Sequence, residues 1–335
     1  MYYKITFMLS LLSGTLLSIS SYSWMGMWMG LEINLLSIIP LMSDTKNMMA
    51  SEAALKYFIT QALASSLLLF SMIILSMNFF YTLDMNLYLS LILNTSLLTK
   101  MGAAPFHFWF PEVMDGLNWP MSLVMLTWQK IAPMMLLTYF SLSSYYLTIT
   151  IIFSMMISGI VGLNQTSLRK ILAYSSINHI GWMLSAILIQ ENTWFLYFIV
   201  YSIITMNIVF FFKMFNIFHL KQLFNSMNHN FSIKFSFILN FLSLAGLPPL
   251  LGFLPKWLTI QALTENSMYA MAILIITMTL MTMYFYLRII FSSLLLNSNE
   301  LAFLYSPPLK SALILVFNFI TVIGLIFSTV LFNFL

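Results

Sequence analysis

The sequence has 335 residues, of which 61% are hydrophobic and only 7% are charged. Because soluble globular domains carry about 25% charged residues, this composition excludes a soluble domain. The absence of cysteine excludes disulfides, thiolate metal sites and thiolate-held iron–sulfur clusters. The net charge of +4 requires no nucleic-acid partner, because lysines at membrane loops account for it.

Apolar runs near the length of a membrane-spanning helix, about 20 residues, recur along the chain. They predict an all-α polytopic membrane protein with eleven transmembrane helices over residues 5–22, 24–42, 53–77, 86–118, 120–140, 146–163, 167–189, 193–216, 234–264, 267–291 and 310–333. Between the eighth and ninth helices we expect a polar loop containing Asn225, Asn228, His229 and Asn230.

Two of these helices are predicted to be discontinuous. In each, a glycine precedes a proline by three residues: Gly102 and Pro105 in the fourth helix, Gly246 and Pro249 in the ninth, where Pro248 adds a second proline. Proline removes a backbone donor and breaks a helix. Non-helical backbone at membrane depth is tolerated only where protein or water lines it.

The two breaks lie five helices apart, which suggests an internal repeat. A unit of five helices crosses the membrane an odd number of times, so its second copy would be inverted. Chance placement of glycine and proline in a long membrane protein is the alternative.

Charge in the loops predicts the orientation of the chain. On this helix map one side carries Lys4, Lys46, Arg169, Lys170, Lys213, Lys221, Lys234, Arg288 and Lys310. The other side carries Asp84, Glu191 and Glu265. The positive-inside rule therefore places the N-terminus on the cytoplasmic side or its equivalent, the mitochondrial matrix, and the C-terminus on the opposite side.

Five ionisable residues lie inside the apolar segments: Glu32, Lys56, Lys100, Lys130 and Lys256. Such groups are costly in a membrane and usually mark a pathway for ions or protons. Lys56 lies nearest a helix end and has the best opportunity to reach the headgroups. Static lysine–glutamate pairs are the alternative, but one deep acid cannot neutralise four lysines, which favours a proton relay.

The other chemistry-bearing residues indicate no catalytic centre. The sequence has no dinucleotide or phosphate loop and no metal-ligand spacing, and its four histidines are scattered. His107 and His179 could relay protons, but a hydrogen-bonded packing role is favoured. The 28 methionines and two arginines are consistent with an AT-rich genome that reads a common codon as Met, as animal mitochondria do.

Four segments resemble the antiporter-like membrane subunits of respiratory complex I: Glu52–Ser65, Gly102–Pro111, Ser167–Gly181 and Gly246–Lys256. They occur in the family's order, and the similarity covers nearly the whole chain. The full-length family has fourteen helices, and this chain resembles the short animal form, which lacks the first three.

The resemblance implies a single antiporter-like membrane domain, with a first repeat over 1–140, a second over 146–292 and a C-terminal loop and helix over 293–335. It implies that Glu32 pairs with Lys100, that Lys130 is the connecting lysine, and that Lys256 is the terminal group. The part of Lys56 is the least defined.

The resemblance also implies a location and partners. The chain would lie in the mitochondrial inner membrane, with its N-terminus in the matrix and its C-terminus in the intermembrane space. It would contact other membrane subunits, including a neighbouring antiporter-like subunit, and lipids such as cardiolipin. NADH, FMN, iron–sulfur clusters and ubiquinone would be bound by other subunits, and no cofactor by this chain. A subunit of a cation/proton antiporter and a structural spacer are the alternatives.

Overall fold

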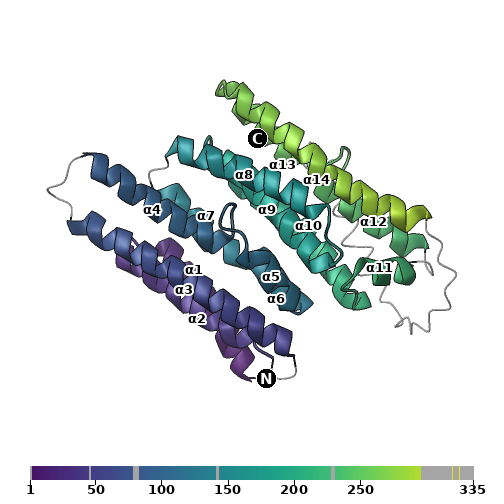
Figure 1. Ribbon diagram of the computed structural model, residues 1–335, viewed down its shortest axis with the longest axis horizontal. Coiled ribbons are helices and arrows are strands. Elements are labelled where there is room, and N and C mark those ends of the chain that lie inside the picture. The colour runs from purple at the N-terminus through teal and green to yellow at the C-terminus, as the bar shows by residue number, and fades with distance from the viewer. Residues whose placement is uncertain are drawn as a thin grey trace. The chain divides into compact units, whose positions relative to one another are not determined.

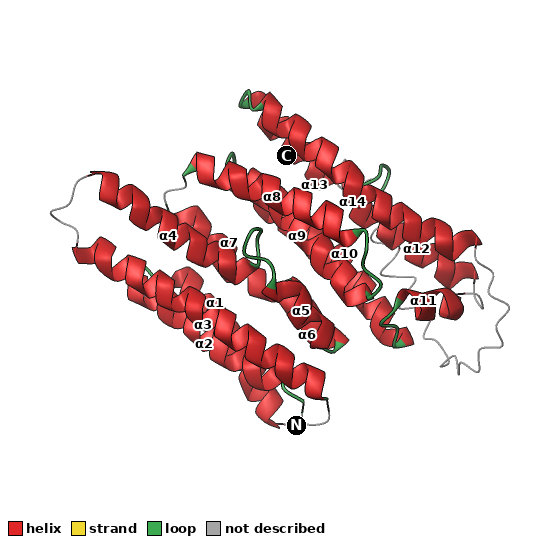
Figure 2. Ribbon diagram, in the orientation of Figure 1, coloured by secondary structure: helices red, strands yellow, loops and turns green. Residues whose placement is uncertain are grey.

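The computed structural model describes residues 2–44, 47–77, 83–140, 143–227 and 231–295, together with Phe319 and Gly324. These residues form α-helices joined by short loops (Figure 2), and the β-type pairing among them is one isolated bridge, Ser167 to His219. The all-helical prediction is confirmed for this part of the chain. The predicted helix 310–333 lies outside the described residues, apart from Phe319 and Gly324.

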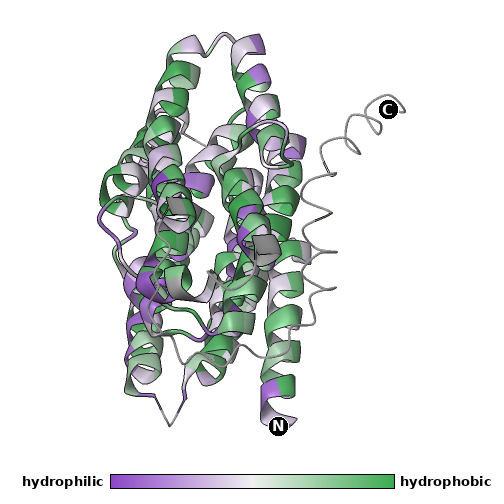
Figure 3. Ribbon diagram, turned by 90° about the vertical axis from the view of Figure 1, so that its right-hand side faces the viewer, coloured by the Kyte–Doolittle hydropathy of each residue, from purple (hydrophilic) through white to green (hydrophobic). Residues whose placement is uncertain are grey.

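Six of the described helices are long and apolar enough to cross a membrane. Apolar residues cover most of the helical ribbon (Figure 3). The six helices are Tyr2–Ser20, Trp24–Met42, Met48–Met77, Ser144–Gly162, Glu191–Phe215 and Tyr269–Leu294. A helix of about 20 residues spans the hydrocarbon core of a bilayer, so this is a multi-pass membrane protein.

The chain divides into two compact units, Met1–Ser154 and Met155–Leu335. The helices of the first unit are α1 (Tyr2–Ser20), α2 (Trp24–Met42), α3 (Met48–Met77), α4 (Leu83–Met101), α5 (Trp109–Gly116), α6 (Trp119–Leu126) and α7 (Trp128–Tyr139). Helix α2 packs against α1 and α3 (Figure 1), and α3 also packs against α4 and α5.

In the second unit, α9 is the central helix. All its residues except Arg169 and Lys170 are buried, and it packs against α10, α13 and α14. The helices are α8 (Ser144–Gly162), which crosses the boundary between the units, α9 (Leu168–Ile187), α10 (Glu191–Phe215), α11 (Leu220–Met227), α12 (Phe231–Ala245), α13 (Phe253–Glu265) and α14 (Tyr269–Leu295).

Both predicted helix breaks are confirmed. Helix α4 ends at Met101 and α5 begins at Trp109, while α12 ends at Ala245 and α13 begins at Phe253. Gly102 and Gly246 have φ values of +74° and +76°, which glycine adopts without steric cost. The peptide bonds Ala104–Pro105 and Pro248–Pro249 are cis.

The same hydrogen bonds end the two helices. The amide of Gly102 donates to the Thr99 carbonyl at 3.2 Å, and that of Ala103 donates to Leu98 at 3.0 Å. At the second break, Gly246 donates to Ser243 at 3.1 Å and Leu247 to Leu242 at 3.3 Å. These 5→2 and 6→1 bonds form a Schellman motif, which satisfies the last carbonyls of a helix.

The predicted helix 120–140 is wrong as a continuous element, because the structure contains α6 and α7 with Thr127 between them. Thr127 has φ −114° and ψ −70°, and its side-chain hydroxyl donates to the Leu123 carbonyl at 2.8 Å. Hydroxyl bonds of this kind bend helices. Pro133, inside α7, also lacks the donor that a continuous helix requires.

The expected polar loop after α10 is also partly wrong, because α11 occupies Leu220–Met227. The side chain of Gln222 accepts hydrogen bonds from the backbone amides of Phe218 and His219, at 2.9 Å and 3.2 Å. It thereby satisfies donors at the start of the helix that otherwise lack partners. Residues 228–230 of the expected loop lie outside the described residues.

Substitution at the second break is expected to destabilise the protein. A Cβ at Gly246 would lie 2.7–2.9 Å from the Lys256 side chain, in a conformation that costs a non-glycine residue roughly 1–2 kcal/mol. We expect Gly246→Ala to lower the thermal unfolding midpoint in mild detergent. The control is Gly162→Ala, whose nearest atom would be a ring carbon of Phe285 at 3.3 Å. Equal midpoints for the two variants would contradict this account of the break.

Candidate functional site

Lys100 lies in the last turn of α4, directly before the first break. Its side chain is 7% exposed, and the half-buried Glu32 on α2 interacts with it electrostatically. The carbonyl ends of a helix carry partial negative charge, which favours a cation in the last turn. The structure therefore brings together the acid and the first-break lysine that the sequence singled out.

Four polar side chains that the sequence analysis did not single out lie around Lys100. Together with Lys100 they line a small cavity of about 10 Å³, and they are Asn34, Tyr57, Gln61 and Gln129. Gln61 donates to the Lys100 carbonyl at 3.5 Å, and Gln129 donates to the side-chain oxygen of Asn34 at 2.9 Å. The one local signal is the spacing of Tyr57 and Gln61, which are four residues apart and therefore lie on the same face of a helix.

Lys130 lies in the first turn of α7, after the interruption at Thr127. It is 1% exposed, and its Nζ lies 5.7 Å from the centroid of the Phe110 ring. A cation over an aromatic face is stabilised by the ring quadrupole. Because Phe110 is on α5, just beyond the first break, Lys130 is anchored to the same break that Lys100 precedes.

Lys56 is placed differently from the other lysines. Its Nζ forms an ion pair with Glu112 of α5 at 2.7 Å, and the two side chains are 52% and 56% exposed. The structure therefore does not bring Lys56 into the buried group around Lys100.

Lys256 lies in the first turn of α13, but its charge is placed at the end of α12. Its side chain is 8% exposed, and Nζ donates to the carbonyl of Ala245, the last residue of α12, at 2.8 Å. Nζ also lies 5.8 Å from the centroid of the Trp182 ring. Lys256 thus places its ammonium group at the C-terminal end of α12, whereas Lys100 is itself a residue of the last turn of α4. Lys100 precedes its break and Lys256 follows its own.

The two histidines of interest are hydrogen bonded. Nδ1 of His179 lies 2.8 Å from the Tyr197 hydroxyl, and Nδ1 of His107 lies 3.3 Å from the Pro105 carbonyl inside the first break. The Tyr197 ring stacks against Trp182, which contacts Lys256. These contacts agree with the packing role favoured for both histidines.

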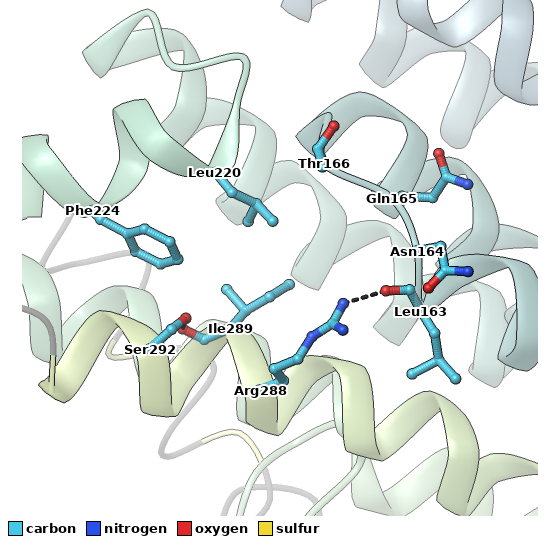
Figure 4. Close-up of a pocket in the computed structure, with 9 residues that line it drawn as sticks. All are labelled: Leu163, Asn164, Gln165, Thr166, Leu220, Phe224, Arg288, Ile289 and Ser292. Atoms are coloured by element: carbon cyan, nitrogen blue, oxygen red, sulfur yellow. Dashed lines mark hydrogen bonds between the residues drawn. The ribbon is translucent and has the colours of Figure 1, made fainter.

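A larger pocket lies between three elements, which are the loop that follows α8, helix α11 and helix α14 (Figure 4). Its volume is about 430 Å³, and Arg288 donates a hydrogen bond across it to the Leu163 carbonyl. None of the five predicted ionisable site residues lines this pocket. In the part of the chain that the structure describes, no group of three or more His, Asp or Glu residues could hold a metal ion.

Comparison with known proteins agrees with this fold. A family model described as "NADH:quinone oxidoreductase/Mrp antiporter, TM" matches residues 21–282. A chain of respiratory complex I from Thermus thermophilus has a TM-score of 0.88 at 24% identity, covering 99% of this chain and 80% of that one. A chain of the Mrp complex from Dietzia has a TM-score of 0.76 at 15% identity, covering 86% and 59%. The class is thus that of antiporter-like membrane proteins.

Proteins with similar sequences assign the chain to one family within this class. NADH-ubiquinone oxidoreductase chain 2 of Locusta migratoria is 47% identical over 96% of this chain and 95% of its own length. The same-named protein of Aedes aegypti is 51% identical over 97% of both chains, and that of Lemur catta is 41% identical over 85% and 84%. The chain belongs to the NADH-ubiquinone oxidoreductase chain 2 family.

The exposure of Lys56 leads to a test of its role. Because exposed ion pairs contribute little to stability and Lys56 lies outside the buried group, we expect Lys56→Gln to leave proton transport close to that of the wild type. The comparison is Lys100→Gln, which removes a buried charge. Transport is measured as acidification by energised membrane vesicles, per amount of assembled protein. A loss with Lys56→Gln as large as with Lys100→Gln would overturn the distinction.

Proposed function

We propose that this chain is a proton-translocating membrane subunit of respiratory complex I, NADH:ubiquinone oxidoreductase. Its family, its multi-pass helical fold and the antiporter-like structures that it resembles support this assignment. Electron transfer from NADH to ubiquinone takes place in other subunits, which bind NADH, FMN, iron–sulfur clusters and ubiquinone. This chain contributes to the enzyme by moving protons and holds no redox centre.

Protons move along a relay of Glu32, Lys100, Lys130 and Lys256. The observation that supports this proposal is the burial of Lys100, Lys130 and Lys256. Lys100 is in the last turn before the first break, and the Lys256 ammonium donates to the carbonyl that ends α12 at the second break. A half-helix end stabilises the charged form without fixing it by a full counter-charge. Each lysine can then take up a proton at Nζ and release it.

Glu32 supplies the controlling charge for Lys100. A carboxylate about 4 Å from an ammonium contributes roughly 4 kcal/mol at an effective dielectric near 20. Moving a charge through 100 mV involves about 2.3 kcal/mol. A movement of Glu32 toward or away from Lys100 therefore changes the free energy of protonating Lys100. This change is comparable with the energy of moving one charge through the membrane potential.

The transmembrane arrangement is part of the proposal. It consists of eleven helices, with inverted repeats over 1–140 and 146–292 and a final loop and helix over 293–335. The paired Schellman endings at Gly102 and Gly246 support equivalent positions in two repeats. The loop charges support an N-terminus in the matrix and a C-terminus in the intermembrane space of mitochondria.

The partners follow from the same assignment. They are the other membrane subunits of complex I, including a neighbouring antiporter-like subunit, and membrane lipids such as cardiolipin. The exposed apolar side chains of α1, α3 and α14 provide surfaces for lipid and neighbouring helices.

Lys256 and Lys234 form a matched pair for testing the relay. Both are 8% exposed and donate to a backbone carbonyl, but Lys234 lies early in α12, bonds to Leu294, and is not at a break. We expect Lys256→Ala to slow proton transfer by about 10²-fold or more, the contribution of a positioned proton-transfer group. Lys234→Ala is expected to retain proton transfer.

The measurement is the rate of proton movement, together with the number of protons moved per NADH oxidised, by purified, reconstituted complex with its redox cofactors quantified. Normal pumping by assembled Lys256→Ala complex would remove Lys256 from the relay. Proton movement that requires sodium or potassium and is independent of NADH oxidation would instead favour the alternative function, a cation/proton antiporter.

A further inference from the structure

Polar side chains from three helices of the first unit converge beside Lys100. Asn34 comes from α2, Tyr57 and Gln61 from α3, and Gln129 from α7. Asn34, Tyr57 and Gln61 are buried, and Gln129 is half-buried. Buried polar groups are costly unless they are hydrogen bonded, so the convergence of four of them at one place requires a physical account.

A directional chain of hydrogen bonds connects three of these side chains. The Tyr57 hydroxyl donates to Oε1 of Gln129 at 3.4 Å, and Nε2 of Gln129 donates to Oδ1 of Asn34 at 2.9 Å. Because Oδ1 faces Gln129, the orientation of the Asn34 amide is set by Gln129. Gln129 is therefore the central member of the chain, with one partner on each side of its amide.

The remaining polar groups of the cluster suit a water molecule. Asn34 has two N–H donors on Nδ2, and an ammonium has three N–H donors. Gln61 uses Nε2 to donate to the Lys100 carbonyl, which leaves Oε1 as an acceptor in the cavity lining. The cavity volume is about 10 Å³, about one water probe sphere, and an ordered water needs 2–4 polar partners.

We propose that this cavity is a binding site for a single water molecule that hydrogen-bonds the Lys100 ammonium, and that Gln129 is the positioning residue that holds Asn34 against it. The water accepts a hydrogen bond from Nζ of Lys100 and donates one to Oε1 of Gln61. It gives the buried ammonium a hydrated contact through which a proton leaves Nζ. The role of this water in transport rests on the proposed relay function of Lys100.

The key variant is Gln129→Leu, which keeps the approximate size of the side chain and removes both of its hydrogen bonds. We expect the assembled complex to move protons about tenfold more slowly, because one step then loses its positioned hydrogen-bond partner. Gln129→Asn, which keeps both the amide donor and the amide acceptor on a shorter side chain, is expected to restore part of the rate. A role in packing alone predicts no such rescue and no change in the rate per assembled complex.

A matched control lies on the same helix. Thr138 of α7 donates a local hydrogen bond to the Met135 carbonyl and is not among the residues that line the cavity. We expect Thr138→Val complex to transport protons at the wild-type rate. Wild-type rates for both Gln129→Leu and Thr138→Val would overturn the positioning role.

High-resolution density of the intact complex tests the water directly. We expect one ordered water at hydrogen-bond distance, about 2.7–3.2 Å, from Lys100 Nζ and Gln61 Oε1 in the wild type, and its loss in Gln129→Leu. Absence of that density in the wild type would overturn the site even if the variants fail to assemble. Normal transport by Lys100→Ala would instead overturn the relay, whereas a defect in Lys100→Ala with normal Gln129→Leu would overturn only the positioning role of Gln129.

Discussion

The fold depends on keeping lysine ammonium groups inside a bilayer. An isolated charge at that depth is expensive, and in the part of the chain that the structure describes the deep lysines are held by nearby protein groups. Lys256 donates to the last carbonyl of α12, Lys100 lies in the last turn of α4, and Lys130 lies over the Phe110 ring. Lys100 also has the nearby carboxylate of Glu32, whereas the other partners lower the cost of the charge without supplying a full counter-charge.

The helix breaks supply these partners. A continuous helix uses its carbonyl groups internally, whereas a helix that ends inside the protein presents its last turn as a negative end. At both breaks a glycine with positive φ closes the Schellman motif, and the following prolines prevent the helix from continuing. Gly246 also leaves room for Lys256, because a Cβ there would collide with the lysine side chain. At the second break the same glycine therefore ends the helix and leaves space for the lysine side chain.

The order of the lysine and the glycine along the sequence differs between the two units. In the first, the lysine precedes the glycine in sequence, and Gln61 contacts its backbone carbonyl. In the second, Lys256 follows Gly246 by ten positions and reaches back across the break to Ala245. The surroundings of the two lysines differ as well, because Lys100 interacts with Glu32 whereas Lys256 has the Ala245 carbonyl and the Trp182 ring. What the breaks share is a buried lysine beside a Schellman ending.

The sequence was sufficient to predict the helical membrane class and both breaks, because apolar runs, glycine and proline act locally. The pairing of Glu32 with Lys100 rests on the family resemblance and stays a prediction. The interruption at Thr127 was missed because threonine is compatible with a helix, and only its side-chain bond to Leu123 reveals the disturbance. Helix α11 was missed because its Gln222 cap lies within a polar run. The cluster of Asn34, Tyr57 and Gln129 depends on contacts between helices far apart in sequence, which composition does not encode.

The central claim is that the lysines at the two breaks act in series in one relay. It is tested most directly by proton transfer rates of assembled complex carrying Lys100→Met, Lys256→Met or both. Groups that act as a unit are strongly non-additive, so the double variant should be no slower than the slower single variant. Losses that multiply, as expected for independent sites, would contradict a single relay.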